Sequence, residues 1–367
     1  MKVVAMGGGT GLSILLQGLK KYARDEWAGG ELRLSSDTPL AELTAVVTVT
    51  DDGGSSGRLR RDFQVLPPGD IRNCMVALSE DEALLSRLFQ YRFPAGRGLK
   101  GHSFGNLFLT ALTAVTGDFQ DAVKVSSEVL AIRGRIFPST NASVTLEARM
   151  EDGRLVRGET QITRSRSRIQ RLRLAPARCR PLPQTLQAME EADAITLGPG
   201  SLFTSLLPNL LVPGVARSLA RSRAARIFIC NLMTQPGETS GYSAAAHLRA
   251  VYEHCGRKLF DYALLNDAAA SARSRRRYLA QHSRQVENDA AALERLGVRV
   301  ITRDLLLESK GGPAIAGKVR HDSGRLAEAV LEIATHHQSS LSRPGEKKAR
   351  VSGNRPARLP LPVGRVS

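Results

Sequence analysis

The chain has 367 residues, enough for one large domain or two ordinary ones, and its 42% hydrophobic content and 33 glycines predict an α/β protein with many tight loops. Its formal net charge of +17 favours anionic partners such as nucleotides, nucleic acid or an acidic surface. The uneven distribution argues against nucleic acid, because residues 341–367 alone hold seven Lys and Arg against one Glu and such charge runs are usually solvated tails.

The cysteine pattern and the lack of long apolar runs bear on where the protein works. The four cysteines are widely spaced and form no C-x-x-C pair, which is typical of buried thiols in a reducing compartment. The N-terminal stretch reaches glycine too soon to hold a signal-peptide core. No uninterrupted apolar run approaches the ~18 residues of a membrane span. We therefore expect a cytoplasmic protein without a membrane span.

The N-terminal stretch predicts a phosphate-binding turn. Lys2–Met6 has the composition of a short strand, and Leu12–Tyr22 carries apolar residues at helical spacing. Four glycines and a threonine lie between them, and a strand, a glycine loop and a helix form the arrangement that holds phosphates in nucleotide folds. The run matches neither the dinucleotide fingerprint nor a Walker P-loop, so a purely structural turn is the alternative. The candidate phosphate-binding residues are Gly8, Gly9, Thr10 and Gly11.

A second strand ends in an acidic, glycine-rich turn. Ala45–Thr50 is apolar and β-branched, as in a strand buried on both faces, and Asp51 and Asp52 follow it directly. Ligands of open α/β sheets collect at the carboxyl ends of the strands, so these carboxylates are candidates to hold a metal, a ribose hydroxyl or a proton. In the small-residue run that follows, Ser55 and Ser56 are candidate phosphate contacts. The alternative is a solvated turn that caps the next helix.

Two further helix starts carry polar clusters. Asp70 is expected to cap a helix, and Asn73 in its first turn either contacts a ligand or ties down the loop. Before the expected helix Leu107–Val115, His102 and Asn106 form a polar group suited to a phosphate or a sugar. No G-x-S-x-G elbow is present, so a serine nucleophile is not indicated.

The centre of the chain changes character. Residues 133–183 are rich in arginine and alternate apolar and polar side chains, which predicts a small β-rich insertion. Its expected strands are Ser143–Met150, Leu155–Ile162 and Ile169–Leu174. Upstream of the second strand, the polar stretch Arg24–Glu42 is expected to be a surface excursion.

The α/β pattern returns after the insertion. Ala194–Leu197 is an expected strand, and the small-residue loop after it precedes a helix start, which predicts a second anion site. Its candidate ligands are Gly198, Gly200, Ser201 and Thr204. Further strands are expected at Arg226–Asn231, Ala263–Asn266 and Val298–Ile301, and a last helix at Leu326–Thr335. Residues 1–335 would form the nucleotide-binding domain, and residues 336–367 a basic, disordered tail.

Seven stretches of this chain together resemble one known family. In order they are MGGGTGLSILLQGLK, VVTVTDDGGSSGRLR, LPPGDIRNCMVAL, GHSFGNLFLTALT, LGPGSLFTSLLPNLLVPG, CNLMTQPGET and RHD. They resemble the YvcK-type proteins, the gluconeogenesis-factor branch of the CofD-like superfamily. The resemblance runs from about Lys2 to Thr335 and excludes the basic tail.

The resemblance implies a Rossmann-like α/β fold, with a mostly parallel sheet and helices on both faces. It also implies binding of a nucleotide, a UDP-sugar such as UDP-N-acetylglucosamine or an NAD-like ligand. Members of this branch are cytoplasmic factors for cell shape and envelope synthesis during gluconeogenic growth, so a protein partner in cell-wall synthesis is expected. Related CofD enzymes transfer a phospholactyl-type group from a guanosine diphospho donor to a deazaflavin, using magnesium, but do not share the whole DDGGSSGRLR or MTQPGET signature.

Two functional hypotheses follow. In the first, the protein binds a nucleotide sugar without turnover: Arg320 contacts the diphosphate, and Asp51 and Asn209 contact the ribose or base. In the second, it is a transferase similar to 2-phospho-L-lactate transferase, with Asp51 and Asp52 as catalytic Mg²⁺ ligands. No clear general base stands out apart from His102. Nucleotide folds often form dimers, but no stretch of the sequence identifies an interface.

Overall fold

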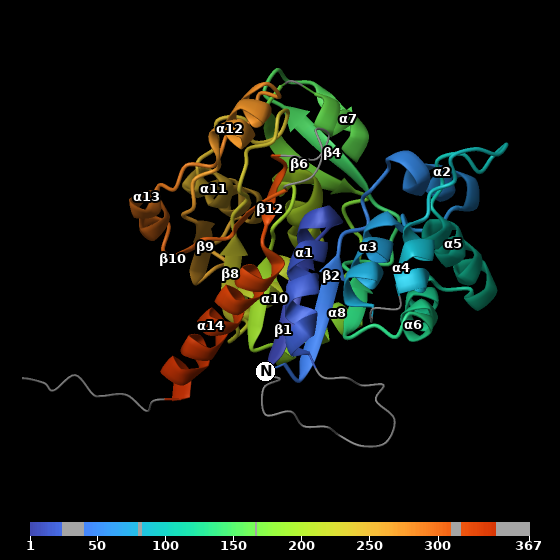
Figure 1. Cartoon of the computed structure of the whole chain (residues 1–367), viewed down its shortest axis with the longest axis horizontal. Helices are drawn as coiled ribbons and strands as arrows, with labels where there is room; N and C mark the ends of the chain where they lie inside the picture. The colour runs from blue at the N-terminus through green and yellow to red at the C-terminus, as the bar shows by residue number, and fades with distance from the viewer. Residues whose placement is uncertain (24–39, 80–82, 166, 310–316, 343–367) are drawn as a thin grey trace, which may run out of the picture.

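Short apolar runs alternate with amphipathic helices and build one seven-stranded parallel sheet (Figure 1). The computed structural model describes residues 1–23, 40–79, 83–165, 167–309 and 317–342. In spatial order the strands are β10 (Arg299–Arg303), β9 (Tyr262–Asn266), β8 (Ala225–Ile229), β7 (Ala194–Leu197), β1 (Lys2–Gly7), β2 (Glu42–Val47) and β3 (Arg135–Pro138). This architecture confirms the expected Rossmann-like class.

The strand order reverses between β1 and β7. The chain first runs outward through β1, β2 and β3, and it later starts again beside β1 and runs the other way through β7, β8, β9 and β10. β1 pairs in parallel with both β2 and β7. The two loops that leave β1 and β7 must therefore diverge at the carboxyl edge, and such a switch point is where open α/β sheets bind ligands.

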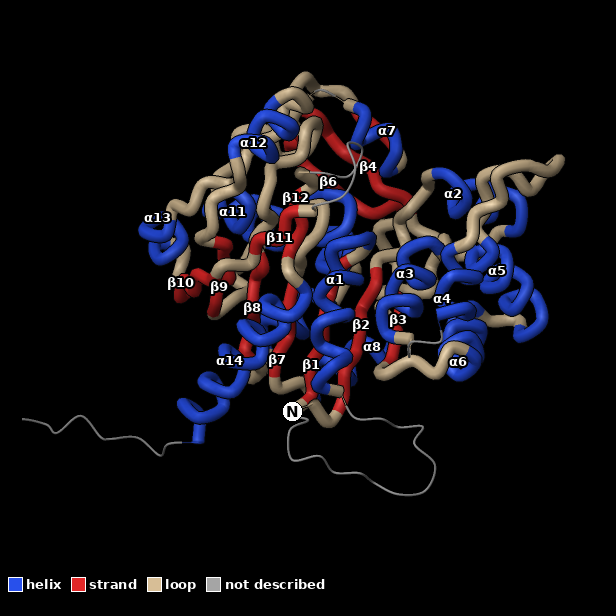
Figure 2. The backbone as a smooth tube through the Cα atoms, in the orientation of Figure 1, coloured by secondary structure: helices blue, strands red, loops and turns tan. Residues whose placement is uncertain are grey.

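Helices cover both faces of the sheet. Figures 1 and 2 show α1 and α14 in front of the strands, with α3 beside α1, whereas α8, α10 and α11 lie behind them. The first six helices are α1 (Gly9–Leu19), α2 (Gly54–Phe63), α3 (Gly69–Leu78), α4 (Ala83–Gln90), α5 (Phe104–Thr116) and α6 (Phe119–Val129). The remainder are α7 (Glu159–Arg164), α8 (Pro183–Glu191), α9 (Leu207–Leu211), α10 (Val215–Arg221), α11 (Ala244–Cys255), α12 (Ala272–Leu279), α13 (Ala290–Arg295) and α14 (Ser323–Ser342).

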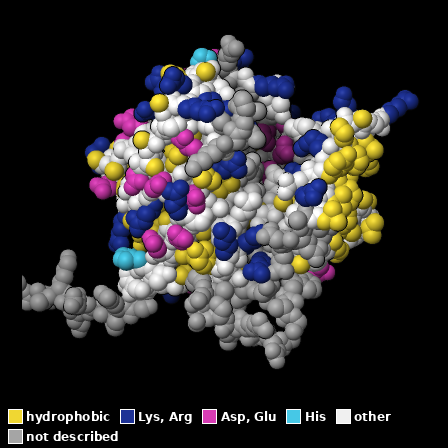
Figure 3. Space-filling model, viewed as in Figure 1, with side chains coloured by type: hydrophobic (Ala, Val, Ile, Leu, Met, Phe, Trp, Pro, Cys, Tyr) yellow, Lys and Arg dark blue, Asp and Glu magenta, His cyan; other side chains and the backbone are white. Residues whose placement is uncertain are grey.

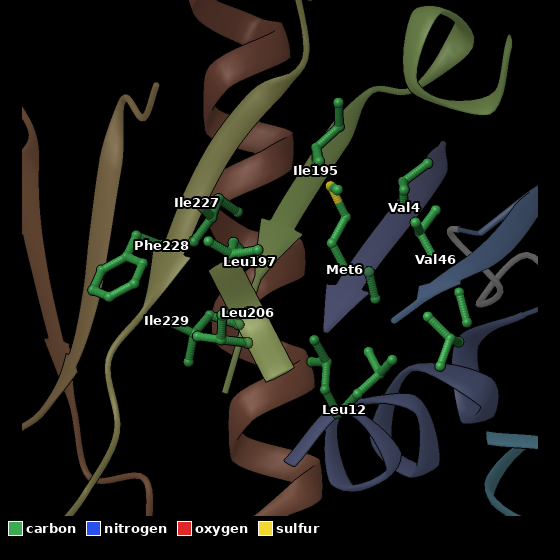
Figure 4. Close-up of a cluster of buried hydrophobic side chains, with 14 of the residues drawn as sticks. Val4, Met6, Leu12, Val46, Ile195, Leu197, Leu206, Ile227, Phe228 and Ile229 are labelled. Carbon is green, nitrogen blue, oxygen red and sulfur yellow. The ribbon is translucent and has the colours of Figure 1, made fainter. Parts of the chain in front are cut away.

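Coverage on both faces explains why the central strands are apolar without alternation. All residues of β7 and β9 are buried, as are five of the six in β1. Figure 4 shows Met6 of β1 and Leu197 of β7 in the core beside Leu12 of α1. Among the described residues no single helix has the length and apolar composition of a membrane span; one bent pair, Leu202–Leu211 with Val215–Arg221, meets that criterion when its two parts are taken together.

The insertion forms a separate small sheet. β4 (Thr145–Met150) pairs antiparallel with β5 (Leu155–Arg157) and with β6 (Ile169–Ala175), and a further pair joins β11 (Leu306–Glu308) to β12 (Val319–His321). The expected strand Leu155–Ile162 is wrong beyond Arg157. Gly158 turns the chain with a φ of +89°, and the next residues form α7.

Other boundaries also differ from the sequence-based expectations, and three of these differences concern the site or the tail. β2 ends at Val47, so Thr48–Thr50 belong to the loop that leads to the acidic turn. The first helix begins three residues early, at Gly9, and its end becomes the 3₁₀ turn Lys20–Tyr22. α14 continues to Ser342, so residues 336–342 are helical rather than disordered. Within this part of the helix, His337 hydrogen-bonds to the hydroxyl of Tyr262 on β9. Residues 343–367 and most of the Arg24–Glu42 excursion (24–39) lie outside the described residues.

Candidate functional site

A cavity of about 600 Å³ opens where the loops after β1 and β7 diverge. Of the residues singled out from the sequence, it is lined by Gly8, Gly9, Thr10, Gly11, Asp51, Gly200, Ser201 and Arg320. Further lining comes from Asp70, Glu159, Asn231, Gln235, Tyr278, Ser283 and His321, among others. The volume lies within the range that holds a nucleotide-sized ligand.

The N-terminus of α1 faces this cavity with its backbone amides. Gly8 is the N-cap in an extended conformation, and no side chain caps the helix. Gly9 has a φ of +61°, which a side chain disfavours. A Cβ on Gly11 would overlap the carbonyl oxygen of Pro199 in the loop after β7. The glycines therefore bring two loops into backbone contact and leave helix N–H groups available to an anion.

The loop after β7 is clamped by one asparagine. The Asn231 side chain accepts a hydrogen bond from the Gly200 N–H at 3.1 Å and donates one to the Gly200 carbonyl at 2.7 Å. Gly198 has a φ of +97°, and a Cβ there would lie 2.7 Å from the Ile229 carbonyl oxygen. Gly198 therefore allows the turn to pack against β8, and it does not line the cavity.

The π-helical turn Leu202–Leu206 follows this loop and leads into α9, and its first residues bind the carboxyl group of Glu238. The Phe203 N–H donates to Glu238 Oε2 at 3.3 Å, and the Thr204 hydroxyl donates to Oε1 at 3.2 Å. Glu238 is buried, and burial raises its pKa, although these bonds oppose the shift. The expected second anion site is therefore occupied from within the chain, and Thr204 is a partner of Glu238.

Three carboxyl groups form one wall of the cavity beside the α1 glycines. A Cβ on Gly8 would lie 2.7 Å from Asp70 Oδ2, and the Gly9 N–H hydrogen-bonds to Asp70. Burial, followed by the neighbouring charge of Asp51, raises the pKa of Asp70 to about 7. Burial and the charges of Asp51 and Asp70 raise the pKa of Glu159 to about 9. At neutral pH Glu159 is therefore a neutral hydrogen-bond donor and Asp70 is partly protonated.

Asp51 and Asp52 do not form the expected metal-binding pair. Asp51 Oδ1 accepts a hydrogen bond from the Gly53 N–H at 2.8 Å and faces the cavity. Asp52 Oδ1 instead accepts bonds from the Thr160 N–H at 2.9 Å and the Thr160 hydroxyl at 2.6 Å. Among the described residues no three His, Cys, Asp or Glu side chains come together as a metal site. The side chains present therefore do not form a preformed Mg²⁺ centre.

The serine, histidine and asparagine candidates meet in a second group, between α2 and α5. Ser55 Oγ lies 3.0 Å from His102 Nδ1, and the Asn106 amide donates to Ser56 Oγ at 3.4 Å. All four side chains are buried, and none lines the cavity. Burial and the charge of Arg58 lower the pKa of His102, so its ring is neutral at pH 7. This group joins the acidic turn to α5.

Two other candidates are tied to the protein framework. Asn73 Oδ1 accepts a hydrogen bond from the Arg72 guanidinium at 2.6 Å, which favours the loop-tying alternative. Asn209 is fully buried, and its amide donates to the carbonyls of Gly7 at 3.1 Å and Ser205 at 2.8 Å. It holds the end of β1 and does not line the cavity, in contrast to the expected ribose or base contact.

Arg320, the expected diphosphate contact, lines the cavity. It lies on β12 at the cavity, is exposed, and donates to Ser309 Oγ at 3.4 Å. No other Lys or Arg side chain occurs in the described lining. An exposed guanidinium at the rim of an otherwise acidic cavity is available to a phosphate.

Gln235 and His321, which were not among the site residues expected from the sequence, line the cavity and carry unpaired buried acceptors. Gln235 donates to Ser201 Oγ at 2.7 Å, but its Oε1 is buried and has no partner among the described residues. His321 is 6% exposed, and burial lowers its pKa to about 4 against a hydrogen bond with the Cys230 backbone. Its Nε2 also lacks a described partner. Since an unpaired buried acceptor is costly, both atoms favour a ligand that brings hydrogen-bond donors.

Tyr278 is a further missed residue. Its hydroxyl accepts a bond from the Val319 N–H at 3.1 Å and lies 3.3 Å from the Val319 carbonyl oxygen, which fixes the strand that carries Arg320. Gln235 and His321 stand in the motifs MTQPGET and RHD, which offered a signal, whereas Tyr278 lies in an arginine-rich stretch that offered none.

Comparison with known proteins gives consistent matches. The family model described as 2-phospho-L-lactate transferase CofD matches residues 3–306. The chain is 50% identical to a putative gluconeogenesis factor of Nostoc sp., covering 92% of this chain and 70% of that protein. It is 45% identical to the gluconeogenesis factor of Bacillus subtilis, covering 90% and 98%. A crystal structure of a Bacillus halodurans protein is similar with a TM-score of 0.82 at 44% identity, covering 90% of this chain and 99% of that one.

Proposed function

Because the chain belongs to the CofD family and, within it, to the gluconeogenesis factors, we propose that it binds a nucleoside-diphosphate sugar of the UDP-N-acetylglucosamine type. The observation that carries this proposal is the uncapped N-terminus of α1, which opens through a glycine loop into the cavity of about 600 Å³. The diphosphate would lie against the amides of Thr10 and Gly11, next to the Gly9 N–H that hydrogen-bonds to Asp70, where the helix dipole favours negative charge.

The other walls of the cavity suit the rest of such a ligand. Arg320 would contact the second phosphate from the rim, since guanidinium matches phosphate geometry. Asp51 and the neutral carboxyl of Glu159 would accept and donate hydrogen bonds to sugar hydroxyls. Asp70 lies closest to the glycines, so its protonation would ease the approach of an anion.

The biological role in this proposal is that of a sensor. The protein would bind the nucleotide sugar in the cytoplasm and, through a protein partner, adjust cell-wall synthesis and cell shape during gluconeogenic growth. The printed names of the Bacillus subtilis and Halalkalibacterium halodurans relatives, both gluconeogenesis factors, support the metabolic part of this role.

A second candidate is a Mg²⁺-dependent transferase similar to the 2-phospho-L-lactate transferase whose family model matches. The observation that favours it is the placement of Asp51 and Asp70 on the same cavity wall as the glycine loop. Mg²⁺ is often held by one or two carboxylates together with ligand phosphates, so a metal would need the donor already in place.

Calorimetry with product analysis separates the two candidates. The full chain is titrated with UDP-N-acetylglucosamine, GDP and NAD, with and without Mg²⁺, and each mixture is then checked for breakdown. Binding of the UDP-sugar with full recovery supports the sensor, whereas Mg²⁺-dependent consumption of a donor supports the transferase. No binding of any nucleotide contradicts both.

Arg320→Ala tests the placement of the diphosphate. It should weaken UDP-sugar binding about tenfold, a typical loss for a charge-assisted contact, without changing the melting temperature. The matched control is Arg303→Ala, an exposed arginine on β10 that pairs with Glu332 and lies outside the cavity lining. Equal affinity of the Arg320 variant and the wild type would remove Arg320 from the site.

A further inference from the structure

The outer surface of α4 and α5, outside the cavity lining, exposes apolar side chains that no other part of the described chain covers. Helix α5 contains no charged residue, and its outward positions include Ala111 and Val115, the latter 82% exposed. Neighbouring α4 adds Leu84 and Leu88, which are 75% and 40% exposed. Figure 3 shows the resulting patch over this region. We call it the α4–α5 face; its members are Leu84, Leu88, Tyr91, Ala111, Ala114 and Val115.

On their inner side, the same two helices pack against each other. The ring of Phe89 lies 5.9 Å from that of Phe104 and 5.1 Å from that of Phe108, so α4 and α5 join through aromatic contacts. The outward residues therefore add nothing to this packing. Contiguous exposed apolar patches on soluble proteins usually mark an interaction site.

The two ends of α5 carry opposite charges. The loop before it contains Arg92, Arg97 and Lys100, all exposed, and no acidic residue occurs between positions 91 and 103. At the other end, α6 starts with Asp118 and has Asp121 in its first turn. With 13 residues, α5 separates these groups by about 20 Å.

We infer that the α4–α5 face is an interface with a second copy of this chain, in which the two α5 helices pack antiparallel about a twofold axis. In that arrangement the basic loop of each copy lies beside the acidic start of α6 in the other. Parallel packing would instead oppose like charges. Among the described residues of the two helices that form the face, Arg87 on α4 is the one exposed cation, and α5 has none. A single cation is too few to hold an acidic peptide or nucleic acid, so a second copy fits the face better than either.

Sedimentation of the full chain across micromolar concentrations tests the interface. The wild type should be a dimer, and Ala111→Glu and Val115→Glu should each weaken dimerisation at least about tenfold, because each introduces an unpaired charge at the apolar centre. Leu279→Glu is the matched control: Leu279 is 54% exposed at the end of α12, away from this face, so the dimer should persist. Circular dichroism melting confirms that each variant is folded.

A charge exchange tests the antiparallel arrangement. Arg97→Glu and Asp121→Arg should each weaken the dimer at low salt, and the double variant should recover most of the wild-type affinity, because the exchanged charges again face each other. A chain that sediments as a monomer throughout, or a dimer insensitive to both glutamate substitutions on α5, would overturn the interface. Single charge variants that weaken the dimer without rescue in the double variant would overturn the antiparallel pairing.

Discussion

Two loops of this protein have nearly the same sequence character and different chemical roles. Both follow a buried central strand, both are rich in glycine, and both lead into a helix. The first, after β1, leaves the N–H groups of α1 without a side-chain cap. The second, after β7, has its helix start bound by the buried carboxylate of Glu238.

The difference teaches that a helix N-terminus is an anion site only when nothing in the same chain already satisfies it. A glutamate bound to backbone N–H groups supplies the negative charge that a phosphate would bring. Asp70 is an intermediate case, because it approaches the first loop and hydrogen-bonds to Gly9 but has a pKa of about 7. It can therefore give up its charge near neutral pH, when an anionic ligand arrives.

The largest expected effect on affinity comes from adding a side chain to the glycine loop after β1. Gly11→Ala places a Cβ against the Pro199 carbonyl oxygen, so the two loops must separate and the amides lose their alignment. We expect UDP-sugar affinity to fall about a hundredfold or more, since several charge-assisted hydrogen bonds are lost together. Gly324→Ala at the start of α14 is the control, because a Cβ there meets only Asp322 at an ordinary 3.4 Å. Unchanged affinity in calorimetry would place the phosphates elsewhere.

The next effect concerns the unpaired acceptors of Gln235 and His321 in the cavity lining. His321→Phe and Gln235→Leu each remove an acceptor that a ligand donor would satisfy, and each should cost about tenfold in affinity. The control is His254→Phe, since His254 is also buried but has backbone partners on both ring nitrogens, away from the cavity. That control should lower stability and leave affinity intact. If both cavity variants bind as tightly as the wild type, these atoms do not face the ligand.

Much of the fold followed from local pattern, and the site followed only in part. Buried strands such as Ala194–Leu197 and the glycine turn at Gly8 to Gly11 have signatures within a few residues, so both were confirmed in place. The hydrogen bonds from Glu238 to the residues after the second loop could not be predicted, because Glu238 comes 35 residues after Phe203 in the chain. Asp52 likewise does not line the cavity, because its carboxylate hydrogen-bonds to Thr160 in the insertion. Such partners depend on tertiary contacts that no local pattern reports.

The pH dependence of nucleotide affinity is a third test, and its expected effect is smaller. The pKa of Asp70 in the folded protein, about 7, lies above its ordinary value of 3.8, so its neutral form is the one the fold favours. Its contribution to stability is therefore full below about pH 4 and declines as the pH rises toward 7. Nucleotide affinity measured without Mg²⁺ should likewise increase from pH 8 to pH 6 by up to about tenfold.

Asp70→Asn separates this effect from other titrating groups. The amide keeps the shape of the side chain and removes its charge, so the variant should bind more tightly than the wild type at pH 8 and lose most of the pH dependence. Glu159, whose pKa is about 9, stays protonated over this range and serves as an internal reference. A pH profile that Asp70→Asn leaves unchanged would show that Asp70 does not oppose the anion.

The smallest effect on nucleotide affinity is expected at the loop after β7. This substitution directly tests whether the two loops have different roles. Glu238→Gln keeps the side chain in place but replaces one accepting oxygen by an NH₂ group that faces the donors of Phe203 and Thr204. Loss of a charge-assisted bond in a buried site should lower unfolding free energy by about 1–3 kcal/mol, seen as a lower melting temperature. Nucleotide affinity should stay within about twofold of the wild type, because Glu238 and Thr204 lie outside the cavity lining. A tenfold loss of affinity without loss of stability would mean that the second loop, too, holds the ligand.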